Sequence, residues 1–372
     1  MGEKMNYSAK ILSTAVIARA EDKYFAWPTI IRRENGELLV VFSGDRQYHC
    51  CPYGKTMLIR SSDNGATWSE PEVITDTPLD DRDAGILETD KGTLLLSHFT
   101  SIGFESPDVM KWVFPNNPEK VHKAIASWQH IIDDLSDEVR DKYLGSCLRR
   151  STDGGKTWSD IQRIATSTPH GPIKLRDGRL LYVGRTIYGP DAEAPLAEKK
   201  RYSREHRGQV EIYESTDDGL NWHKIGAVPR NEEYKYGCEP YCVECADGRL
   251  VTFLRETIMG VSESTDGGHT WSDPVSTGIA GFPPHFYTLS NGKILLVYSC
   301  RFEPNGQFAR ISDDNGRSWS ERFQLSFAPN ADHGYPASTQ LPDGSILTVY
   351  YEIDRPGEKT SIKLVHWVLE EN

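Results

Sequence analysis

The residues of this chain that could do chemistry are arginines, carboxylates and tyrosine near the ends of short apolar segments. Glu239 and Arg255 flank one pair of such segments, and Tyr335 and Glu352 flank another. Guanidinium groups bind carboxylates through paired hydrogen bonds. Glu and Tyr side chains can exchange a proton with a reacting group. A convergent set of these residue types indicates a site for an acidic ligand.

A repeated pattern, S-x-D-x-G-x-x-W, is expected to set the positions of these residues. It occurs five times, beginning at Ser61, Ser151, Ser215, Ser264 and Ser312. In each copy, called an Asp-box below, the Asp carboxylate is expected to accept backbone N–H groups in a tight turn. Gly takes the positive-φ position and Trp packs between sheets. The pattern therefore predicts a folding role for these aspartates and no catalytic one.

Six further segments each contain two apolar runs that are separated by a Gly-containing turn, which is a strong hairpin signal. They are residues 28–44, 83–99, 170–185, 239–256, 285–301 and 335–352. Hairpins and Asp-boxes alternate along the chain, so each hairpin and the box-bearing strands after it predict one four-stranded blade. The sequence predicts an all-β fold, a six-bladed β-propeller with five Asp-box repeats and a helical insertion.

We expect residues 1–372 to form one propeller domain with two insertions, because no Pro/Ser-rich linker divides the chain. Residues 103–145 contain a stretch with Trp128, Ile131 and Leu135 at helical spacing, and residues 188–208 form a charged loop. Residues 360–370, with a strand around residues 9–18, are expected to complete the sixth blade and close the ring.

The hairpin turns and the Asp-box turns are expected on one face, which makes the opposite face the mouth of the propeller. If the hairpin turns have two residues, the register pairs Tyr335 with Glu352 and Glu239 with Glu256. The ring of residues predicted at the mouth comprises Asp45, Arg82, His170, Arg185, Glu239, Arg255, Glu256, Arg301, Tyr335 and Glu352.

The Asp-boxes and the six-blade count resemble the sialidase (neuraminidase) superfamily over nearly the whole chain. Residues 239–255 resemble the segment in which sialidases carry a catalytic Glu and an Arg of the carboxylate-binding triad, which implies these roles for Glu239 and Arg255. Arg301 is the preferred match to another triad arginine, ahead of Arg310.

Residues 335–352 resemble the sialidase segment with the tyrosine nucleophile and a final Glu, which implies these roles for Tyr335 and Glu352. The resemblance implies that Glu239 takes the phenolic proton and that an aspartic acid protonates the leaving oxygen. A neutral tyrosine suits an anomeric carbon that already bears a carboxylate, because it avoids charge repulsion.

Two departures from the sialidase pattern affect the site. Where sialidases have Arg-Ile-Pro in the first blade, this chain has Ala26-Trp27-Pro28, so the first triad arginine is absent. We expect Arg46 or Arg82 to replace it and Trp27 to offer a flat face on which a sugar stacks.

The second departure concerns the aspartic acid that protonates the leaving oxygen in sialidases, which has no clear match in this chain. The nearest candidate is Asp45, followed by Asp83 and His49.

The resemblance implies an exo-acting glycoside hydrolase that cleaves a terminal acidic sugar, sialic acid or a related one, from a glycan. The insertion at 103–145 would cap the mouth and favour chain ends. Two alternatives stay open. In an acidic-polysaccharide lyase, His170 or Tyr335 would abstract a proton while Arg185 neutralises the uronate. The other alternative is a non-catalytic carbohydrate-binding propeller.

Composition limits the partners. With 54 acidic and 42 basic residues the formal net charge is -12, which works against nucleic acid or an anionic membrane. No apolar run reaches the roughly 18 residues of a membrane span, and the first residues lack a secretory h-region. We therefore expect a cytoplasmic protein, or a secreted or periplasmic one if a signal has been trimmed. A carbohydrate substrate is the expected partner, and no metal or organic cofactor is implied.

Overall fold

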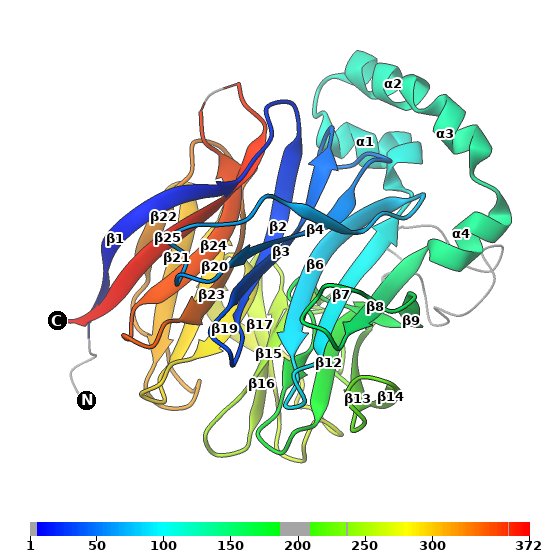
Figure 1. Ribbon diagram of the computed structural model, residues 1–372. Coiled ribbons are helices and arrows are strands. Elements are labelled where there is room, and N and C mark those ends of the chain that lie inside the picture. The colour runs from blue at the N-terminus through cyan, green and yellow to red at the C-terminus, as the bar shows by residue number, and fades with distance from the viewer. Residues whose placement is uncertain (1–5, 187–208, 236, 356) are drawn as a thin grey trace.

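Six sheets are arranged as the blades of a propeller (Figure 1). The computed structural model describes residues 6–186, 209–235, 237–355 and 357–372. Five sheets have four strands and the third has five, because its innermost strand is split in two. The predicted all-β six-bladed propeller with Asp-box repeats is therefore confirmed.

In each of the first three blades, the strands are named in order from the axis outward. Blade 1 consists of β2 (Tyr24–Arg32), β3 (Leu38–Arg46), β4 (Lys55–Ser61) and β5 (Glu72–Thr75). Blade 2 consists of β6 (Asp80–Glu88), β7 (Leu94–Ser101), β8 (Gly145–Ser151) and β9 (Gln162–Ile164). Blade 3 consists of β10 (Thr166–Ser167), β11 (Ile173–Lys174), β12 (Leu180–Thr186), β13 (Val210–Ser215) and β14 (His223–Ala227).

The remaining blades follow the same order, and the sixth joins the two ends of the chain. Blade 4 consists of β15 (Cys238–Glu244), β16 (Leu250–Arg255), β17 (Ile258–Ser264) and β18 (Val275–Ala280). Blade 5 consists of β19 (Phe282–Thr288), β20 (Ile294–Cys300), β21 (Gly306–Ser312) and β22 (Phe323–Phe327). Blade 6 consists of β23 (Gly334–Gln340), β24 (Ile346–Ile353), β25 (Thr360–Glu371) and, outermost, β1 (Tyr7–Ala18). As expected, β1 pairs with β25 and closes the ring.

The second strand of each blade is the most apolar because neighbouring blades cover both of its faces. Every residue of β12 and of β20 is buried. Between blades 1 and 2, one cluster joins Leu39, Val41 and Leu58 to Ile86 and to others of β6 and β7. These inter-blade cores hold the innermost strands, and thus the mouth residues, at fixed positions around the axis.

The Asp-boxes form the turns that their sequence predicts. In the first box, Asp63 accepts a hydrogen bond from the backbone nitrogen of Thr67 at 2.9 Å. Ser61 accepts one from the nitrogen of Gly65 at 2.9 Å, and the indole nitrogen of Trp68 donates to the carbonyl of Gly65 at 3.1 Å. Gly65 has a φ of 85°, which a non-glycine residue would adopt only with strain.

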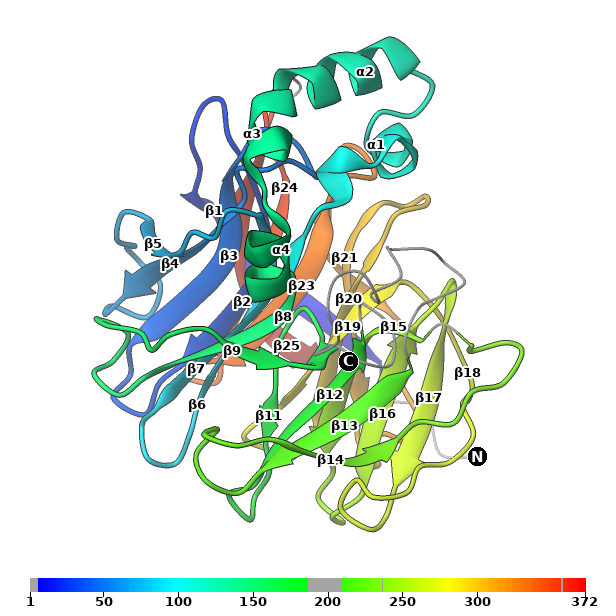
Figure 2. The same ribbon diagram turned by 90° about the vertical axis from the view of Figure 1, so that its right-hand side faces the viewer.

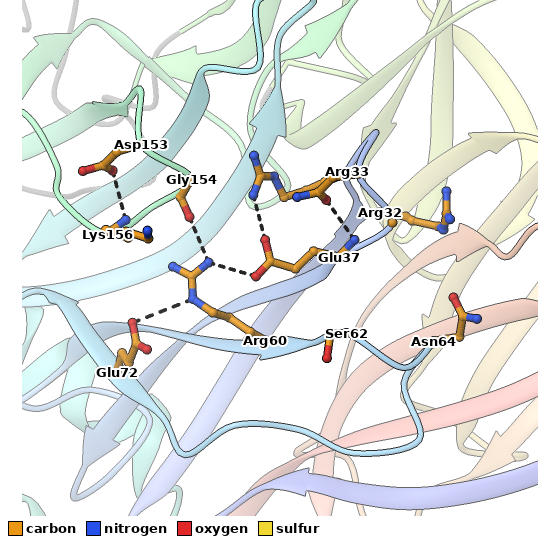
Figure 3. A pocket seen from close by; sticks show the side chains of 12 residues that line it. Arg32, Arg33, Glu37, Arg60, Ser62, Asn64, Glu72, Asp153, Gly154 and Lys156 are labelled. Carbon is orange, nitrogen blue, oxygen red and sulfur yellow. Dashed lines mark hydrogen bonds and ion pairs between the residues drawn. The ribbon is translucent and has the colours of Figure 1, made fainter.

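A crevice of about 850 Å³ lies where the first hairpin turn meets the first two Asp-boxes (Figure 3). Its charged groups bond to one another: Glu37 pairs with Arg33 at 2.7 Å and with Arg60 at 3.4 Å. Arg60 also donates to the carbonyl of Gly154 at 2.9 Å. Hairpin turns and boxes therefore share one face, as predicted. The bonds across this crevice connect blade 1 to blade 2.

Five innermost strands carry a β-bulge at the same level. In each, two residues lie opposite one residue of the second strand: residues 27–28, 83–84, 239–240, 283–284 and 335–336. Trp27, Asp83, Glu239 and Tyr335, the first residues of four of these pairs, have φ values of 56°, 45°, 40° and 55°. Non-glycine residues with positive φ are uncommon and cluster at functional sites.

The bulges and the hairpin turns change the predicted register. Cys245 donates its N–H to the carbonyl of Arg249, and Gly248 donates back to Cys245, so this turn has three residues instead of two. The bulge adds a further shift, and Arg255 lies opposite Cys238. The predicted pairing of Glu239 with Glu256 is wrong. So is that of Tyr335 with Glu352, since Tyr351 lies opposite Gly334.

Four helices lie between β7 and β8, the first three beyond one end of the blades and the last lower, close to β8 (Figures 1 and 2). They are α1 (Pro107–Val113), α2 (Pro118–Ser127), α3 (Gln129–Asp134) and α4 (Asp137–Tyr143), preceded by the 3₁₀ turn Gly103–Glu105. Ser106, Asn117 and Ser136 cap α1, α2 and α4 by accepting backbone N–H bonds. We call these four helices the helical cap.

The helical cap is fixed to the first blade by its own apolar core. Trp128, 1% exposed, packs with Cys50, Cys51 and Phe104, and its indole nitrogen donates to the side-chain oxygen of Gln47 at 2.9 Å. The cap therefore has a defined position against residues 47–51, which follow β3. The predicted loop at 188–208 lies outside the described residues. Within the described part of the chain, no helix has the length and apolar character needed to cross a membrane.

Candidate active site

Tyr335, Glu239 and Arg255 form a hydrogen-bonded group at the mouth. The Tyr335 hydroxyl donates to one carboxylate oxygen of Glu239 at 2.9 Å. A terminal guanidinium nitrogen of Arg255 bonds to the other oxygen of Glu239 and lies 3.0 Å from the Tyr335 hydroxyl. Blades 4 and 6 thus bring together three residues that are far apart in the sequence. Glu239 and Tyr335 are both first residues of bulges, with φ values of 40° and 55°.

The environment keeps Glu239 ionised and Tyr335 protonated. Burial by itself would raise the pKa of Glu239, but the charge and the hydrogen bond of Arg255 outweigh it and lower the pKa. Burial and the neighbouring Glu239 charge raise the pKa of Tyr335 well above 10. The phenol can therefore lose its proton only to a base, and the carboxylate that accepts its hydrogen bond is such a base.

Asp83 is the second carboxyl group at this level. It is 6% exposed, and its Oδ1 atom has no hydrogen-bond partner. Burial, together with the charge of Glu239, raises its pKa from 3.8 to about 7, although Arg82 opposes the shift. The charge of Asp83 also raises the pKa of Tyr335, so the two side chains interact electrostatically. Asp83 can thus hold a proton at neutral pH and donate it.

Two arginines accompany Arg255. The Arg301 guanidinium donates to the Tyr351 hydroxyl at 3.1 Å and to the backbone carbonyl of His333 at 2.9 Å. The guanidinium carbons of Arg255 and Arg301 lie 4.5 and 5.4 Å from the ring centre of Phe282. Both also lie 6.0 Å from the ring of Tyr335. Phe282 thus holds two cations close together, and such a pair favours an anionic ligand.

Arg82 lies on the blade 1 side of this group. Its guanidinium carbon is 4.3 Å from the ring centre of Trp27, and it donates to the carbonyl of His49 at 2.6 Å. The side chain is 12% exposed. The charges of both Arg82 and Arg301 act on His49, so the two arginines lie near each other around this histidine.

Arg46 is not available to a ligand. Its side chain is 0% exposed and pairs with Asp80, also 0% exposed, at 2.6 Å. The expectation that Trp27 offers a stacking face is wrong as well. Trp27 is 1% exposed, and the guanidinium groups of Arg46 and Arg82 lie over its ring. Of the two proposed replacements for the missing arginine, only Arg82 reaches the mouth.

Asp45 and Glu352 bond to lysines and not to the Tyr335 group. Asp45 pairs with Lys23 at 2.8 Å and with Lys55 at 3.2 Å. Burial alone would raise the pKa of Asp45, but these lysines lower it, so Asp45 does not hold a proton at neutral pH. Glu352, 3% exposed, pairs with Lys363 of β25 at 2.9 Å.

His170 and Arg185 lie at different depths along the propeller axis. His170 is 2% exposed, bonds to Thr29 at 3.0 Å and packs edge-on against His285. Burial lowers its pKa to about 3. Thr29 and His285 line a separate cavity of about 440 Å³ that reaches the hairpin-turn face. Arg185 instead lies beside the mouth group, because it donates to Cys238 Sγ at 2.8 Å and acts on the charge of Glu239.

Sequence reasoning missed four residues of the mouth: Tyr24, Phe282, Asp332 and Tyr351. Asp332 accepts hydrogen bonds from the hydroxyls of Tyr24 at 2.7 Å and of Tyr351 at 3.4 Å. A signal for the bulges does exist in the sequence. Proline follows the first bulge residue at positions 28, 240, 284 and 336, and proline inside a strand marks a bulge or an edge.

Within the described ranges, no group of three or more His, Cys, Asp or Glu side chains is placed to hold a metal ion. The ionisable groups that the mouth brings together are the arginines, the two acids and the tyrosine. This set of groups can bind a carboxylate, accept a phenolic proton and donate a second proton.

The chain belongs to the BNR repeat-like domain family, whose model matches residues 120–348. Two curated relatives are similar. A sialidase of Micromonospora viridifaciens is 24% identical over 347 residues, which covers 87% of this chain and 49% of that protein. The anhydrosialidase of Macrobdella decora is 29% identical over 230 residues, which covers 56% of this chain and 29% of that protein. The resemblance to the sialidase superfamily is thus confirmed, and the chain spans about half or less of these relatives.

Solved structures share the fold. A protein of unknown function from Dyadobacter fermentans superposes with a TM-score of 0.75 at 22% identity, covering 98% of this chain and all of that one. The intramolecular trans-sialidase of Ruminococcus gnavus superposes with a TM-score of 0.61 at 16% identity, covering 97% and 96% of the two chains. At such identities the likeness establishes the propeller and leaves the activity to be argued from the site.

Proposed function

We propose that this protein is an exo-acting glycoside hydrolase of the sialidase type, which removes a terminal acidic sugar from a glycan. The observation that carries the proposal is the Tyr335 hydroxyl, which lies 2.9 Å from Glu239 and 3.0 Å from Arg255. A nucleophile, its base and a cation that orients the base are thus in mutual contact. The names of the two curated relatives support the same class of reaction.

In the first step, Tyr335 Oη attacks the anomeric carbon and its proton passes to Glu239. The attacking group is neutral, so it is not repelled by a carboxylate on the same carbon. Asp83 donates its proton to the glycosidic oxygen, and the bond from that oxygen to the anomeric carbon breaks. A raised pKa of about 7 suits Asp83 to this task. Asp83 takes the acid role that the sequence assigned first to Asp45.

In the second step, water hydrolyses the tyrosyl–sugar bond. The ionised Asp83 removes a proton from the water, whose oxygen bonds to the anomeric carbon, and Glu239 returns its proton to the departing Tyr335 oxygen. Each residue is then restored to its starting state. Burial of Tyr335, which is 5% exposed, limits water at the nucleophile before the sugar has bound.

Arg82, Arg255 and Arg301 are assigned to the substrate carboxylate. Arg255 and Arg301 lie together over Phe282, and Arg82 approaches from the opposite side, over Trp27. Arg82 thereby substitutes for the arginine that is missing at Ala26. Arg185 lies next to Cys238 and is assigned to a more distant polar group of the sugar.

The test is hydrolysis of aryl glycosides of sialic and uronic acids by wild type, Tyr335→Phe and Glu239→Gln. Each substitution should lower kcat/KM at least about 10³-fold, while the thermal midpoint shows that the fold persists. Wild-type rates in both variants would contradict the proposal. Release of an unsaturated product, detected by ultraviolet absorbance, would indicate a lyase instead. Binding without turnover would indicate a carbohydrate-binding propeller.

A further inference from the structure

An exposed tryptophan, Trp112, stands at the edge of the mouth. It lies in α1 of the helical cap and is 62% exposed. Its ring packs edge-on against His49 with 4.8 Å between ring centres and 77° between planes. An exposed indole offers a flat apolar face to a ligand. Trp112 differs from the other exposed hydrophobic residues because it lies beside His49.

Trp112 is held rigidly although it is exposed. Met110 and Phe114 of the same segment are buried in the core of the helical cap, and Val109 and Val113 pack against that core. At 100° per residue Trp112 lies outside this buried stripe. The segment is anchored by the Ser106 cap at one end and by the buried Trp128 nearby. A fixed ring can bind a flat partner with little loss of side-chain entropy.

His49 connects Trp112 to the reacting groups. The His49 ring packs edge-on against Trp27 at 4.9 Å, and its backbone carbonyl accepts a hydrogen bond from Arg82 at 2.6 Å. Asp83 follows Arg82 in β6, whose blade also carries the helical cap between its second and third strands. The proton of Asp83 must be given to the leaving oxygen, so the leaving sugar lies on the side of the mouth that the cap covers.

We infer that Trp112 binds the sugar ring next to the scissile bond, by contact between the indole face and a C–H face of a hexopyranose. This inference rests on the proposed glycosidase function and adds the recognition of the leaving group. Trp112 then acts on the glycan beyond the acidic sugar, whereas Arg82, Arg255 and Arg301 act on the acidic sugar itself. A substrate with a small leaving group makes no contact with the indole.

The experiment compares a disaccharide-linked glycoside with the methyl glycoside of the same acidic sugar. Trp112→Ala should lower kcat/KM for the disaccharide-linked substrate about tenfold, which corresponds to about 1.4 kcal/mol of lost contact, mainly through KM. The loss on the methyl glycoside should be at least fivefold smaller, and Trp112→Phe should restore most of the difference. Leu220→Ala, which alters an exposed side chain of the third Asp-box, should leave both activities unchanged.

Equal losses on both substrates, or no loss on either, would overturn the assignment of Trp112. The proposed function can fail separately. If wild type cleaves neither glycoside, both are titrated calorimetrically into Tyr335→Phe with and without Trp112→Ala. Weaker binding of the disaccharide-linked compound alone would still support the Trp112 subsite. Equal binding by both proteins, or binding by neither, would overturn it.

Discussion

Replacement of Asp83 by asparagine separates the catalytic value of this residue from its cost to the fold. The carboxyl group is 6% exposed and its Oδ1 atom has no partner. Asparagine keeps the shape of the side chain but cannot ionise. The same substitution should therefore remove a proton donor and relieve a buried group that resists ionisation. The two effects have opposite signs and can be measured in one variant.

The effect on stability follows from the pKa of Asp83. The folded protein holds this proton up to about pH 7, whereas an unfolded chain releases it near pH 3.8. Between these values the folded state binds more protons, so its stability falls as the pH rises through this window. The full difference corresponds to about 4 kcal/mol. Asp83→Asn should thus raise the thermal midpoint at pH 8 by about 5 °C and leave it almost unchanged near pH 4.

The effect on activity depends on the leaving group. With an alkyl leaving group, loss of the general acid should lower kcat/KM by about 10²- to 10⁴-fold. With a nitrophenyl group, which departs without a proton, the loss should be below about tenfold. Wild-type kcat/KM should fall as the pH rises above about 7, because Asp83 then loses its proton. The variant should lack this alkaline limb. The acid limb, set by Glu239, should lie below its ordinary pKa of 4.5.

The measurements are calorimetric melting at pH 4 and pH 8 and initial rates on the two classes of glycoside between pH 4 and pH 9. Asp45→Asn is the matched control. Its carboxylate pairs with Lys23 and Lys55, so activity should stay within about threefold of wild type. An Asp83→Asn variant with wild-type rates on alkyl glycosides and an intact alkaline limb would refute the acid assignment.

Two further predictions concern residues of the framework. Arg46→Met removes the shorter of two ion pairs of Asp80, at 2.6 Å between side chains that are both 0% exposed, and leaves only Arg82 at 3.3 Å. Urea unfolding should therefore show a loss of about 3–5 kcal/mol, and a loss below about 1 kcal/mol would contradict a structural role. Asp63→Ala removes the acceptor of the first Asp-box, whose hydrogen bonds lower the pKa of Asp63 to about 2. It should lower the thermal midpoint at pH 7 with unchanged activity. This difference should shrink as the pH falls from 4 toward 2, where wild type also loses the stabilisation, and a midpoint difference independent of pH would contradict the reasoning.

The blades could be predicted because their signals are local. Each Asp-box contains its own hydrogen bonds, and each hairpin turn contains its glycine. The register could not be predicted, since a two-residue and a three-residue turn look alike in the sequence. The turn at Gly248 has three residues. Even a shift of one residue moves side chains to the other face of a strand.

The order of the acid candidates, with Asp45 ahead of Asp83, also depended on features that the sequence does not show. Asp45 and Asp83 both lie near the mouth ends of strands, and both have a positive φ. They differ in their surroundings: Asp83 lies in the bulge at 83–84 with a buried carboxyl group, whereas Asp45 pairs with Lys23 and Lys55. The proline signal marks four bulges but not this one, where Ala84 follows Asp83. The chemistry of Glu239 and Tyr335 was accessible from the sequence, whereas the environment of Asp83 was not.

The ring of bulges has an evolutionary consequence. Regular pairing resumes on both sides of each bulge, so the residue at its first position projects toward the axis without contributing to the ladder. A side chain at such a position can therefore be replaced without a change in the strand pairing around it. Four of the five bulges hold an indole, two carboxyl groups and a phenol, and the fifth holds Pro283. A propeller built this way can change its substrate or lose its reaction through a few replacements, and proteins that share the fold at 16–22% identity need not share one activity.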